Sequence, residues 1–289
     1  METYLRKIYQ RIQALGRRSM RISVIIPTFR PSNYIWQCLA SLESQTLAHD
    51  VFEVVIVLNG PKNPYLRILN DGLDRYGFTF HITLLYAEHP GVSNARNMAL
   101  DVCIGEYVCF VDDDDWVSEY YLEVLSENAQ VDAIPVTDVM DYDDETGQYQ
   151  SGYIHKTYLK QCNKGGISLL SGRSFMSSCW CKMIPRIMIG ANRFDVRYSL
   201  GEDALFMAAL SRSVHTIKLT DRKAVYYRRI NRNSATRRPI SMLRKTQYAV
   251  RLVCSYCVLY LQDVRSANFL FFLSRVAATS LKIFKKEWI

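Results

Sequence analysis

The sequence sets four consecutive carboxylates, Asp112–Asp115, directly behind two apolar residues in the stretch FVDDDDWV. Like charges this close together ionise cheaply only when a positive group meets them. In an extended segment, Asp112 and Asp114 point to one side, and Asp113 and Asp115 to the other. Such oxygen ligands favour Mg²⁺ or Mn²⁺, which take one or two carboxylates together with substrate phosphates. An acidic turn that caps the following helix is the alternative.

A second acidic pair, Glu202 and Asp203, opens a helix that the sequence predicts near Ala204–Ser211. A carboxylate placed within about 3 Å of a hydroxyl group can accept its proton as a general base. Acidic residues are also ordinary in the first turn of a helix, where they offset the helix dipole. The sequence alone leaves both interpretations open for this pair.

Three further side chains are candidates for ligand contacts. Arg96 lies near the start of a predicted helix, where a guanidinium can bind a phosphate or a base edge, although surface arginines are common. Trp180 offers an apolar ring to a sugar, or it belongs to the core. Arg228 opens an arginine-rich stretch, YYRRINRNSATRR, that suits either a diphosphate or a lipid surface.

The elements that must position these residues alternate along the first half of the chain. Apolar runs predict strands at Ile22–Ile26 (stopped by Pro27), Phe52–Leu58, Thr79–Tyr86 and Tyr107–Val111. Helical patterns fall between them, at Tyr34–Ser44, Tyr65–Tyr76 and Ser93–Val102. This alternation predicts a parallel α/β sheet, in which ligands bind beyond the carboxyl ends of the strands. Pro27, Thr28, Asn59 and the four aspartates are therefore expected to meet in one crevice.

The second half is less regular. Val131–Val139 is apolar, whereas Asp138–Gly147 and Lys156–Gly172 are interpreted as irregular loops over the site. Two strands are predicted at Val214–Leu219 and Ala224–Arg229. We predict three parts: a basic amphipathic helix over residues 1–20, a catalytic domain over 21–235, and a helical basic module over 236–289.

The charge is unevenly distributed. Residues 1–20 hold five Lys and Arg against one Glu, and residues 222–289 hold 15 against two acidic residues. Because the whole chain carries +8, the segment between them carries −9. The basic residues avoid the predicted sheet and lack aromatic interleaving, which argues against nucleic acid. Their apolar neighbours favour an interfacial helix on a membrane, with a packed helix whose lysines face water as the alternative.

Hydropathy and cysteine usage indicate the compartment. Uncharged stretches such as Leu252–Gln262 and Ser266–Ser274 are shorter than the roughly 20 residues that cross a bilayer. We expect no signal peptide, because the first residues lack an apolar core. The eight cysteines show no paired zinc spacing, so reduced thiols are expected. The predicted location is cytoplasmic, peripheral at the inner face of the cell membrane.

Five stretches together resemble the family 2 glycosyltransferases, which have the GT-A fold. The matches cover about residues 22–234 in the order of the family, and they are specific as a set. They are VIIPTF (first strand and turn), GVSNARNMAL (the Gly-x-x-x-Ala-Arg-Asn helix), FVDDDDW (the Asp-x-Asp segment) and CWCKMIPRIMI with RFDVRYSLGEDALF (the acceptor side). The resemblance implies a Rossmann-like GT-A sheet, to which the basic helical C-terminal part is an extension.

The resemblance also implies roles. Pro27 and Thr28 line the nucleotide, Arg96 contacts a base edge or phosphate, and Asp203 is the base, with Glu202 as a second candidate. The remaining implied roles belong to donor, metal and sugar contacts. Asp112 and Asp113 are assigned to the ribose and nearby contacts, and Asp114 with Asp112 to Mn²⁺ or Mg²⁺. Asp115 is assigned to either of these two tasks or to a helix cap, Arg228 to the diphosphate and Trp180 to the sugar.

Two positions depart from the pattern of the family. Leu58 and Asn59 stand where aspartates usually recognise the nucleobase, which leaves uridine specificity open, although Asn59 can still donate and accept at a base edge. Ile230 or Asn231 replaces a frequent histidine.

The sequence therefore predicts a metal-dependent inverting transferase of hexosyl or N-acetylhexosaminyl groups. Its donor would be a nucleotide-sugar, most simply a UDP-sugar, and its acceptor a surface glycan on a lipid carrier. A catalytically inactive partner in a glycan-assembly complex is one alternative. A nucleotidyltransferase is another, disfavoured because Pro27-Thr28-Phe29-Arg30 stands where a Gly-rich phosphate loop is expected.

Overall fold

The computed structural model describes residues 22–230, 241–265 and 267–284. The predicted helix over residues 1–20 lies outside these ranges, as do Asn231, Arg232, Arg237 and Arg238.

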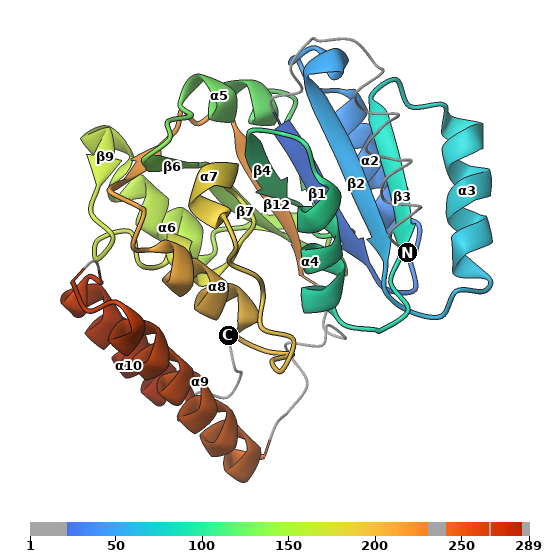
Figure 1. Ribbon diagram of the computed structural model, residues 1–289. Helices are drawn as coiled ribbons and strands as arrows, with labels where there is room; N and C mark the ends of the chain where they lie inside the picture. Colours follow the sequence, from blue (N-terminus) through green and yellow to red (C-terminus); the bar gives the residue numbers. More distant parts are fainter. Residues whose placement is uncertain (1–21, 231–240, 266, 285–289) are drawn as a thin grey trace.

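A five-stranded sheet forms the centre of the molecule (Figure 1). Its strand order is β10-β4-β1-β2-β3, with β4, β1, β2 and β3 parallel and β10 antiparallel to β4. The predicted parallel α/β sheet is therefore confirmed. The strands are β1 (Ile22–Thr28), β2 (Phe52–Leu58), β3 (His81–Tyr86), β4 (Tyr107–Phe110) and β10 (Ile184–Pro185).

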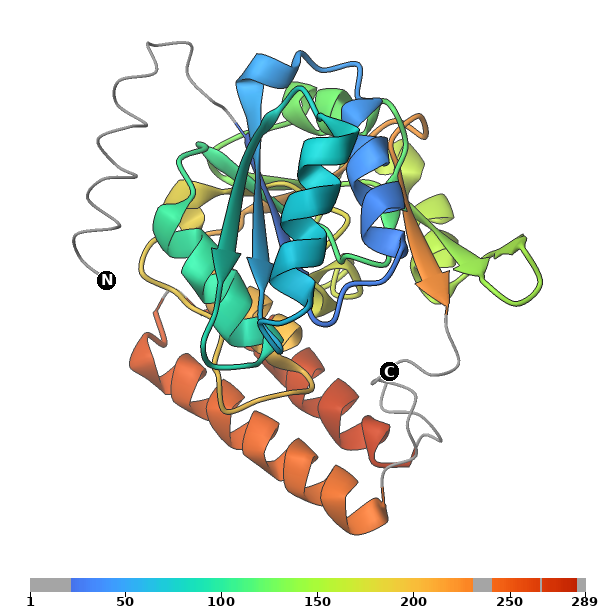
Figure 2. The ribbon, with the colours of Figure 1, turned by 90° about the vertical axis from the view of Figure 1, so that its right-hand side faces the viewer.

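Helices cover both faces of this sheet. Right-handed connections place α2 and α3 on one face, while α4, which returns the chain from β3 to β4, packs on the other (Figure 2). The direction of winding reverses between β1 and β4, and ligands bind at such a reversal in open α/β sheets. The helices are α2 (Tyr34–Glu43), α3 (Tyr65–Tyr76) and α4 (Val92–Val102), with a short 3₁₀ turn at His49–Val51.

The first and third strands differ from their predicted limits. Pro27 does not stop β1. The position where its N–H would be faces β4, and β4 no longer pairs with β1 beyond Ile25, so no hydrogen bond of the sheet is lost. The third strand begins at His81 instead of Thr79, since the Glu43 carboxylate accepts hydrogen bonds from the Thr79 N–H and hydroxyl at 3.0 and 2.8 Å.

Two smaller sheets follow, with strand orders β6-β11-β9 and β5-β12-β7-β8. The predicted irregular loops are wrong in part. Asp138–Asp143 forms β7, which pairs in parallel with β12, and Lys156–Gly172 contains the end of α6 and the short strand β9. Within β7, Asp141 is paired with Arg228 at 2.7 Å, and Asp138 contacts the His155 ring at 2.8 Å. The remaining strands are β5 (Trp116–Val117), β6 (Ala133–Val136), β8 (Gln148–Gln150), β9 (Gly166–Ile167), β11 (Thr216–Leu219) and β12 (Val225–Ile230).

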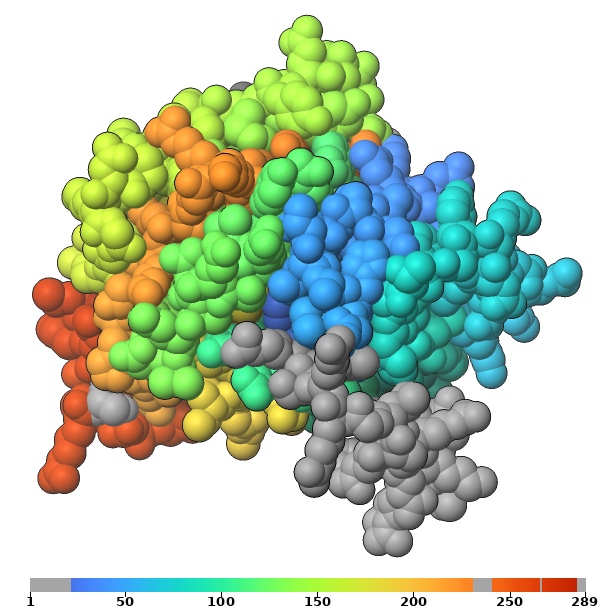
Figure 3. All heavy atoms as spheres, turned by 90° about the horizontal axis from the view of Figure 1, so that it is seen from above, coloured from blue at the N-terminus to red at the C-terminus, as the bar shows by residue number. Residues whose placement is uncertain are grey.

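Short helices fill the gaps between these sheets. In the view from above, α5 lies beside the segment that joins α2 to β2 (Figure 3), where the Thr46 N–H donates to the carbonyl of Glu119 at 2.9 Å. These elements are α5 (Tyr121–Glu127), α6 (Tyr153–Leu159), α7 (Arg186–Ile189) and α8 (Glu202–Leu210), with 3₁₀ turns at Cys162–Lys164 and Phe175–Ser177.

The chain continues into a helical hairpin, α9 (Met242–Gln262) and α10 (Phe269–Lys282), on the side of α8 (Figure 1). Leu252 and Ala249 of α9 pack against Tyr198 and Leu205, so one side of the hairpin is buried. The opposite side exposes many large apolar side chains. Neither hairpin helix, nor any other helix in the described ranges, is long and apolar enough to cross a bilayer.

Arg275 attaches α10 to the rest of the protein. Its guanidinium is buried and donates to the Ser177 hydroxyl at 3.0 Å and to the carbonyls of Arg173 and Met176. Burial lowers the pKa of Arg275 to about 10.

We predict that Arg275→Ala detaches the hairpin, because three acceptors would lose their donor and a cavity would form. The free energy of unfolding should fall by about 2–4 kcal/mol, and trypsin should cleave within α9 and α10 faster. Urea denaturation and limited proteolysis measure these effects. The exposed Arg265→Ala is the control, and equal behaviour of the two variants would contradict the assignment.

Candidate active site

The crevice lies where β1 and β4 end side by side. The Thr28 hydroxyl, at the end of β1, donates a hydrogen bond to the Asp113 carboxylate, which follows β4. Pro27 and Thr28 are themselves buried, whereas the next residue, Phe29, is 53% exposed. The predicted meeting of the first strand with the aspartate run is therefore observed, and Phe29 adds an exposed aromatic ring that the sequence analysis missed.

The four aspartates form a turn, closed by a hydrogen bond of 3.1 Å from the Asp115 N–H to the carbonyl of Asp112. The predicted extended segment with alternating sides is wrong, because strand pairing ends before this point. The carboxylates diverge to different partners. The turn is followed by β5 and not by a helix, so the interpretation as a helix cap is also wrong.

Asp115 is the anchor of this turn. Only 3% exposed, it accepts hydrogen bonds of 2.7 Å from the Tyr226 hydroxyl and from the Arg229 N–H. Burial, reinforced by Asp114 and Asp112, raises the pKa of Asp115 well above its usual range. Its contacts with β12 give it a structural role, which leaves the other three carboxylates for ligands.

Asp114 differs from its neighbours because, among the described residues, no other side chain forms a hydrogen bond or ion pair with its carboxylate. Burial and the nearby Asp112 raise the pKa of Asp114 to about 6, and burial raises that of Asp113 to about 7. Such carboxylates suit a divalent cation.

The described residues contain no group of three or more His, Cys, Asp or Glu side chains arranged to hold a metal. A cation shared with a diphosphate needs only one or two protein carboxylates, and Asp114 would supply one, with Asp112, now paired with Arg96, as the second. The residues thus fit a metal held jointly with substrate phosphates, and not a preformed protein cage.

Arg96 connects the two acidic segments. Its buried guanidinium lies 3.1 Å from the Asp112 carboxylate, 2.5 Å from that of Asp203 and 3.6 Å from that of Glu202. Burial alone would lower the pKa of Arg96, but these carboxylates outweigh it and raise that pKa. The Nε–H is buried and has no hydrogen-bond acceptor in the described part of the chain.

Glu202 and Asp203 begin α8, directly after Gly201, whose φ of +84° favours glycine. Both side chains are mostly buried and lie beside Arg96. Burial, with the neighbouring Asp203, raises the pKa of Glu202 to about 7. The structure therefore brings the predicted base and the aspartate turn to the same guanidinium.

Asn59 is occupied by contacts within the protein. Its amide donates to the carbonyl of Thr28 at 2.9 Å, and its oxygen accepts from the Gly91 N–H at 3.2 Å. The side chain thus joins the end of β1 to the start of α4.

Trp180 and Arg228 lie together behind the aspartate turn. The Trp180 ring, 8% exposed, stacks on Tyr226 with ring centroids 5.1 Å apart. Arg228 lies 5.7 Å from the same ring and makes a bidentate contact with Asp141, at 2.9 and 2.7 Å. Trp180 is thus packed between two neighbours, and Arg228 is held by an acidic partner of its own.

Arg229 belongs to the arginine-rich stretch that was expected to suit a diphosphate or a lipid surface, but its side chain is buried. It donates to the carbonyl of Asp114 at 2.9 Å, to Gln37 at 2.6 Å and to the Asp144 carboxylate. Alternation in β12 places Arg229 on the face of Tyr227, whose ring stacks on Trp116, and the Arg229 guanidinium lies 5.0 Å from that same Trp116 ring.

We predict that Glu202→Gln stabilises the fold at pH 8 and not at pH 4. The pKa of Glu202 is about 7 in the folded chain against an ordinary 4.5. Its ionised form therefore destabilises the protein above pH 7, and this cost disappears below pH 4.5. A gain of about 1–3 kcal/mol at pH 8 is expected from urea unfolding. The exposed Glu127→Gln is the control, and an equal gain at both pH values would refute the prediction.

Comparisons with known proteins agree with this geometry. The chain is 27% identical to glycosyltransferase GlyA of Streptococcus pneumoniae over 231 residues, which is 75% of this chain and 32% of GlyA. It spans less than two thirds of the curated relatives that it matches first. The structure of S. aureus TarS with UDP superposes with a TM-score of 0.68 at 22% identity, covering 92% of this chain and 72% of TarS.

Mannosyltransferase PcManGT from Pyrobaculum calidifontis, solved with GDP-Man and Mn²⁺, superposes with a TM-score of 0.61 at 13% identity, covering 98% of this chain and 76% of PcManGT. These likenesses confirm the GT-A fold. The model of glycosyl transferase family 2 matches residues 23–190, more than half of the sequence. The chain therefore belongs to glycosyl transferase family 2.

Proposed function

We propose that the protein is a metal-dependent inverting glycosyltransferase, which moves a hexosyl or N-acetylhexosaminyl group from a nucleotide-sugar to a glycan. The observation that carries this proposal is the position of Arg96. It lies between Asp112 of the donor-side turn and Asp203 of the candidate base, so a sugar bound at one segment is next to the other.

The donor would enter the crevice at the ends of β1 and β4. Thr28 and Asp113 would contact the ribose, and the exposed Phe29 ring would lie beside the base. Asn59 would act by fixing the backbone at Thr28 and Gly91, since its amide is already engaged. A UDP-sugar is the simplest donor, because the superposable TarS structure was solved with UDP.

Asp114 and Asp112 would hold Mn²⁺ or Mg²⁺. When bound, the cation neutralises the negative charge that develops on the diphosphate. Arg229 keeps the turn in place through the carbonyl of Asp114, and Asp115 fixes it to β12. Arg228, with Trp180 beneath it, is proposed to reach the diphosphate or the sugar from behind the turn.

The chemical step is a single displacement. Asp203 accepts the proton of the acceptor hydroxyl, whose oxygen forms a bond to the anomeric carbon while the bond from that carbon to the phosphate oxygen breaks. Attack from the face opposite the leaving group inverts the anomeric centre. Glu202, beside Asp203, is the second candidate for the proton.

The acceptor is proposed to be a surface glycan on a lipid carrier, with the protein peripheral at the inner face of the cell membrane. The support comes from the hairpin. Its exposed surface combines large apolar side chains with cations, among them Leu243, Leu270 and Leu273 with Arg244 and Arg251. This is the composition of helices that rest in a bilayer interface.

We predict that Asp203→Asn and Asp114→Ala each reduce sugar transfer by about 10²–10⁴-fold. Asp203→Asn should still bind the donor. Asp114→Ala should lose the component of donor binding that depends on Mn²⁺. A thermal-shift screen of nucleotide-sugars with Mn²⁺ identifies the donor, and a radiolabelled-sugar assay measures transfer.

The exposed Asp74→Asn is the matched control. Unchanged transfer in both variants would disprove the mechanism. If the wild-type chain binds a donor but neither transfers nor hydrolyses the sugar, it is an inactive partner of a glycan-assembly complex.

We also predict that the full chain floats with vesicles that contain phosphatidylglycerol. Leu270→Gln with Leu273→Gln should abolish flotation, because both leucines lie on one face of α10 and would no longer enter the interface. Raising the salt concentration should weaken binding. Val131→Gln, which changes an exposed apolar residue outside the hairpin, is the control. If the double variant still floats with the vesicles, the membrane proposal is wrong.

A further inference from the structure

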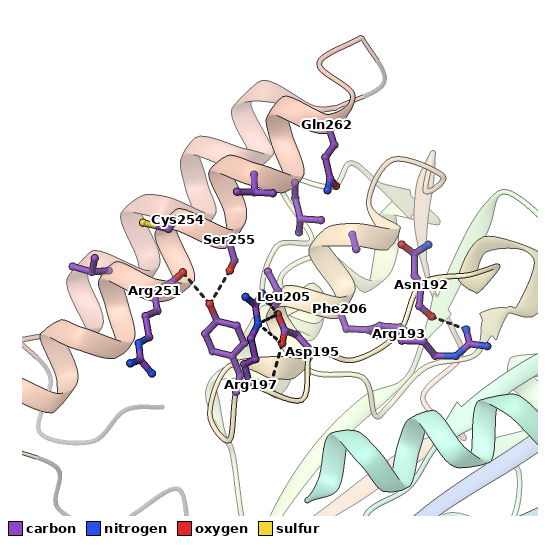
Figure 4. Close-up of a pocket in the computed structure, with 15 residues that line it drawn as sticks. Asn192, Arg193, Asp195, Arg197, Leu205, Phe206, Arg251, Cys254, Ser255 and Gln262 are labelled. Carbon is purple, nitrogen blue, oxygen red and sulfur yellow. Dashed lines mark hydrogen bonds and ion pairs between the residues drawn. The ribbon is translucent and has the colours of Figure 1, made fainter. Parts of the chain in front are cut away.

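A groove of about 830 Å³ lies between α9, α8 and the segment that leads into α8 (Figure 4). Its volume falls within the range of sites that hold small-molecule ligands, roughly 300–1,000 Å³. It is separate from the crevice at the ends of β1 and β4, because none of the aspartates of the turn lines it. The proposed transfer reaction makes no use of it.

One wall of the groove is apolar. On α9 the side chains at 250, 254 and 258 recur every four residues, so they form a single row along the helix. Val250 and Val258 are each 55% exposed, which is unfavourable unless something covers them. The apolar lining consists of Leu205, Phe206, Ala209, Val250, Val258 and Leu259.

The groove also carries cations. Arg193, Arg197 and Arg251 line it, and Asp195 is the one carboxylate among its lining residues, so its charge is positive. Arg197 is paired with Asp195 at 2.6 Å, and Arg193 with Asp101 at 2.8 Å. Arg251 is exposed on α9 (Figure 4), with its guanidinium beside the same groove. Arg251 and Arg197 thus place positive charge beside the apolar row, which matches an amphiphile whose head is an anion.

We propose that this groove binds a lipid phosphate, namely the phosphate and the adjoining hydrocarbon of the lipid that carries the acceptor. The chain lies along the row of Val250 and Val258, and the phosphate contacts Arg251 and Arg197. This inference rests on the proposed function, because it names where the lipid of the acceptor is held.

The groove is joined to the candidate base by direct contacts. Phe206, which lines it, stacks on Phe194 with ring centroids 3.9 Å apart, and Phe194 lies 5.3 Å from the guanidinium of Arg96. Arg96 in turn bonds Asp203. A lipid in the groove is therefore only a few side chains from the site of transfer.

The groove wall also fixes the segment that carries the base. The Tyr198 hydroxyl donates to the carbonyl of Arg251 at 3.0 Å and lies 2.7 Å from the Ser255 hydroxyl. Gly201 lies against Leu252, so closely that a Cβ at this position would be 2.7 Å from a leucine methyl group. Residues 198–201 thus rest on α9, which gives the groove a fixed shape before the lipid binds.

The test is calorimetric titration of the full chain with n-dodecyl phosphate below its micelle concentration. Methyl phosphate supplies the head alone, and dodecyl maltoside supplies the chain with a neutral head. We expect binding of dodecyl phosphate only. Arg251→Gln and Val258→Gln should each weaken it at least tenfold.

Leu261→Gln is the matched control, because Leu261 is an exposed apolar residue of the same helix that does not line the groove. Equal weakening by Leu261→Gln would overturn the proposal in favour of partitioning onto the whole hairpin surface. Equal binding of dodecyl maltoside would overturn the proposal in favour of a purely apolar site. If dodecyl phosphate does not bind at all, the proposal is also overturned.

Donor binding measured on the same variants separates the two proposals. UDP-sugar affinity that stays unchanged while dodecyl phosphate binding is lost supports the groove as a distinct site. If dodecyl phosphate binds as predicted but no nucleotide-sugar binds the wild-type chain, the groove stands and the proposed function fails.

Discussion

The buried guanidinium of Arg96 among three carboxylates is the interaction on which the site depends. A charge with only 4% of its side chain exposed is tolerated because opposite charges surround it. Those charges come from two segments about 90 residues apart in sequence, the turn after β4 and the start of α8. The Arg96 guanidinium is planar and has several N–H donors, so it can bind carboxylates of both segments at once. The single ammonium group of a lysine cannot do so in the same geometry.

The same contact balances the electrostatics of the crevice. Asp112, Glu202 and Asp203 would repel one another if Arg96 were absent, and burial would add to that cost. Asp115 is kept out of this group by Tyr226 and Arg229, while Asp114 keeps a carboxylate that no other described side chain engages. The turn thus contains Asp115, which is held by β12, Asp113, which accepts from the Thr28 hydroxyl, and Asp112, which pairs with Arg96, while Asp114 is proposed to meet a cation.

Sequence alone located most of the site because its residues follow strand ends. In a parallel sheet these ends meet at one edge, so Thr28 and the aspartates were expected together, and Arg96 was expected at a helix start. The partners of each side chain could not be foreseen. The sequence did not reveal that the Asn59 amide would donate to the carbonyl of Thr28. Nor did it reveal that the Asn59 oxygen would accept from the N–H of Gly91, which lies 32 residues later. The strand Asp138–Asp143 was missed because its charges hide the pattern, and Asp141 is buried against Arg228, which is 87 residues away in the sequence.

The close approach of Gly201 to Leu252 has a consequence for how this chain can change. The start of α8 and the middle of α9 occupy adjoining space. At Gly201, the φ of +84° favours glycine, and a side chain would collide with Leu252. The C-terminal helices and the segment bearing the base must therefore vary together. Grafting this hairpin onto another member of the family, or replacing it with a foreign one, would require rebuilding the entrance to α8 as well.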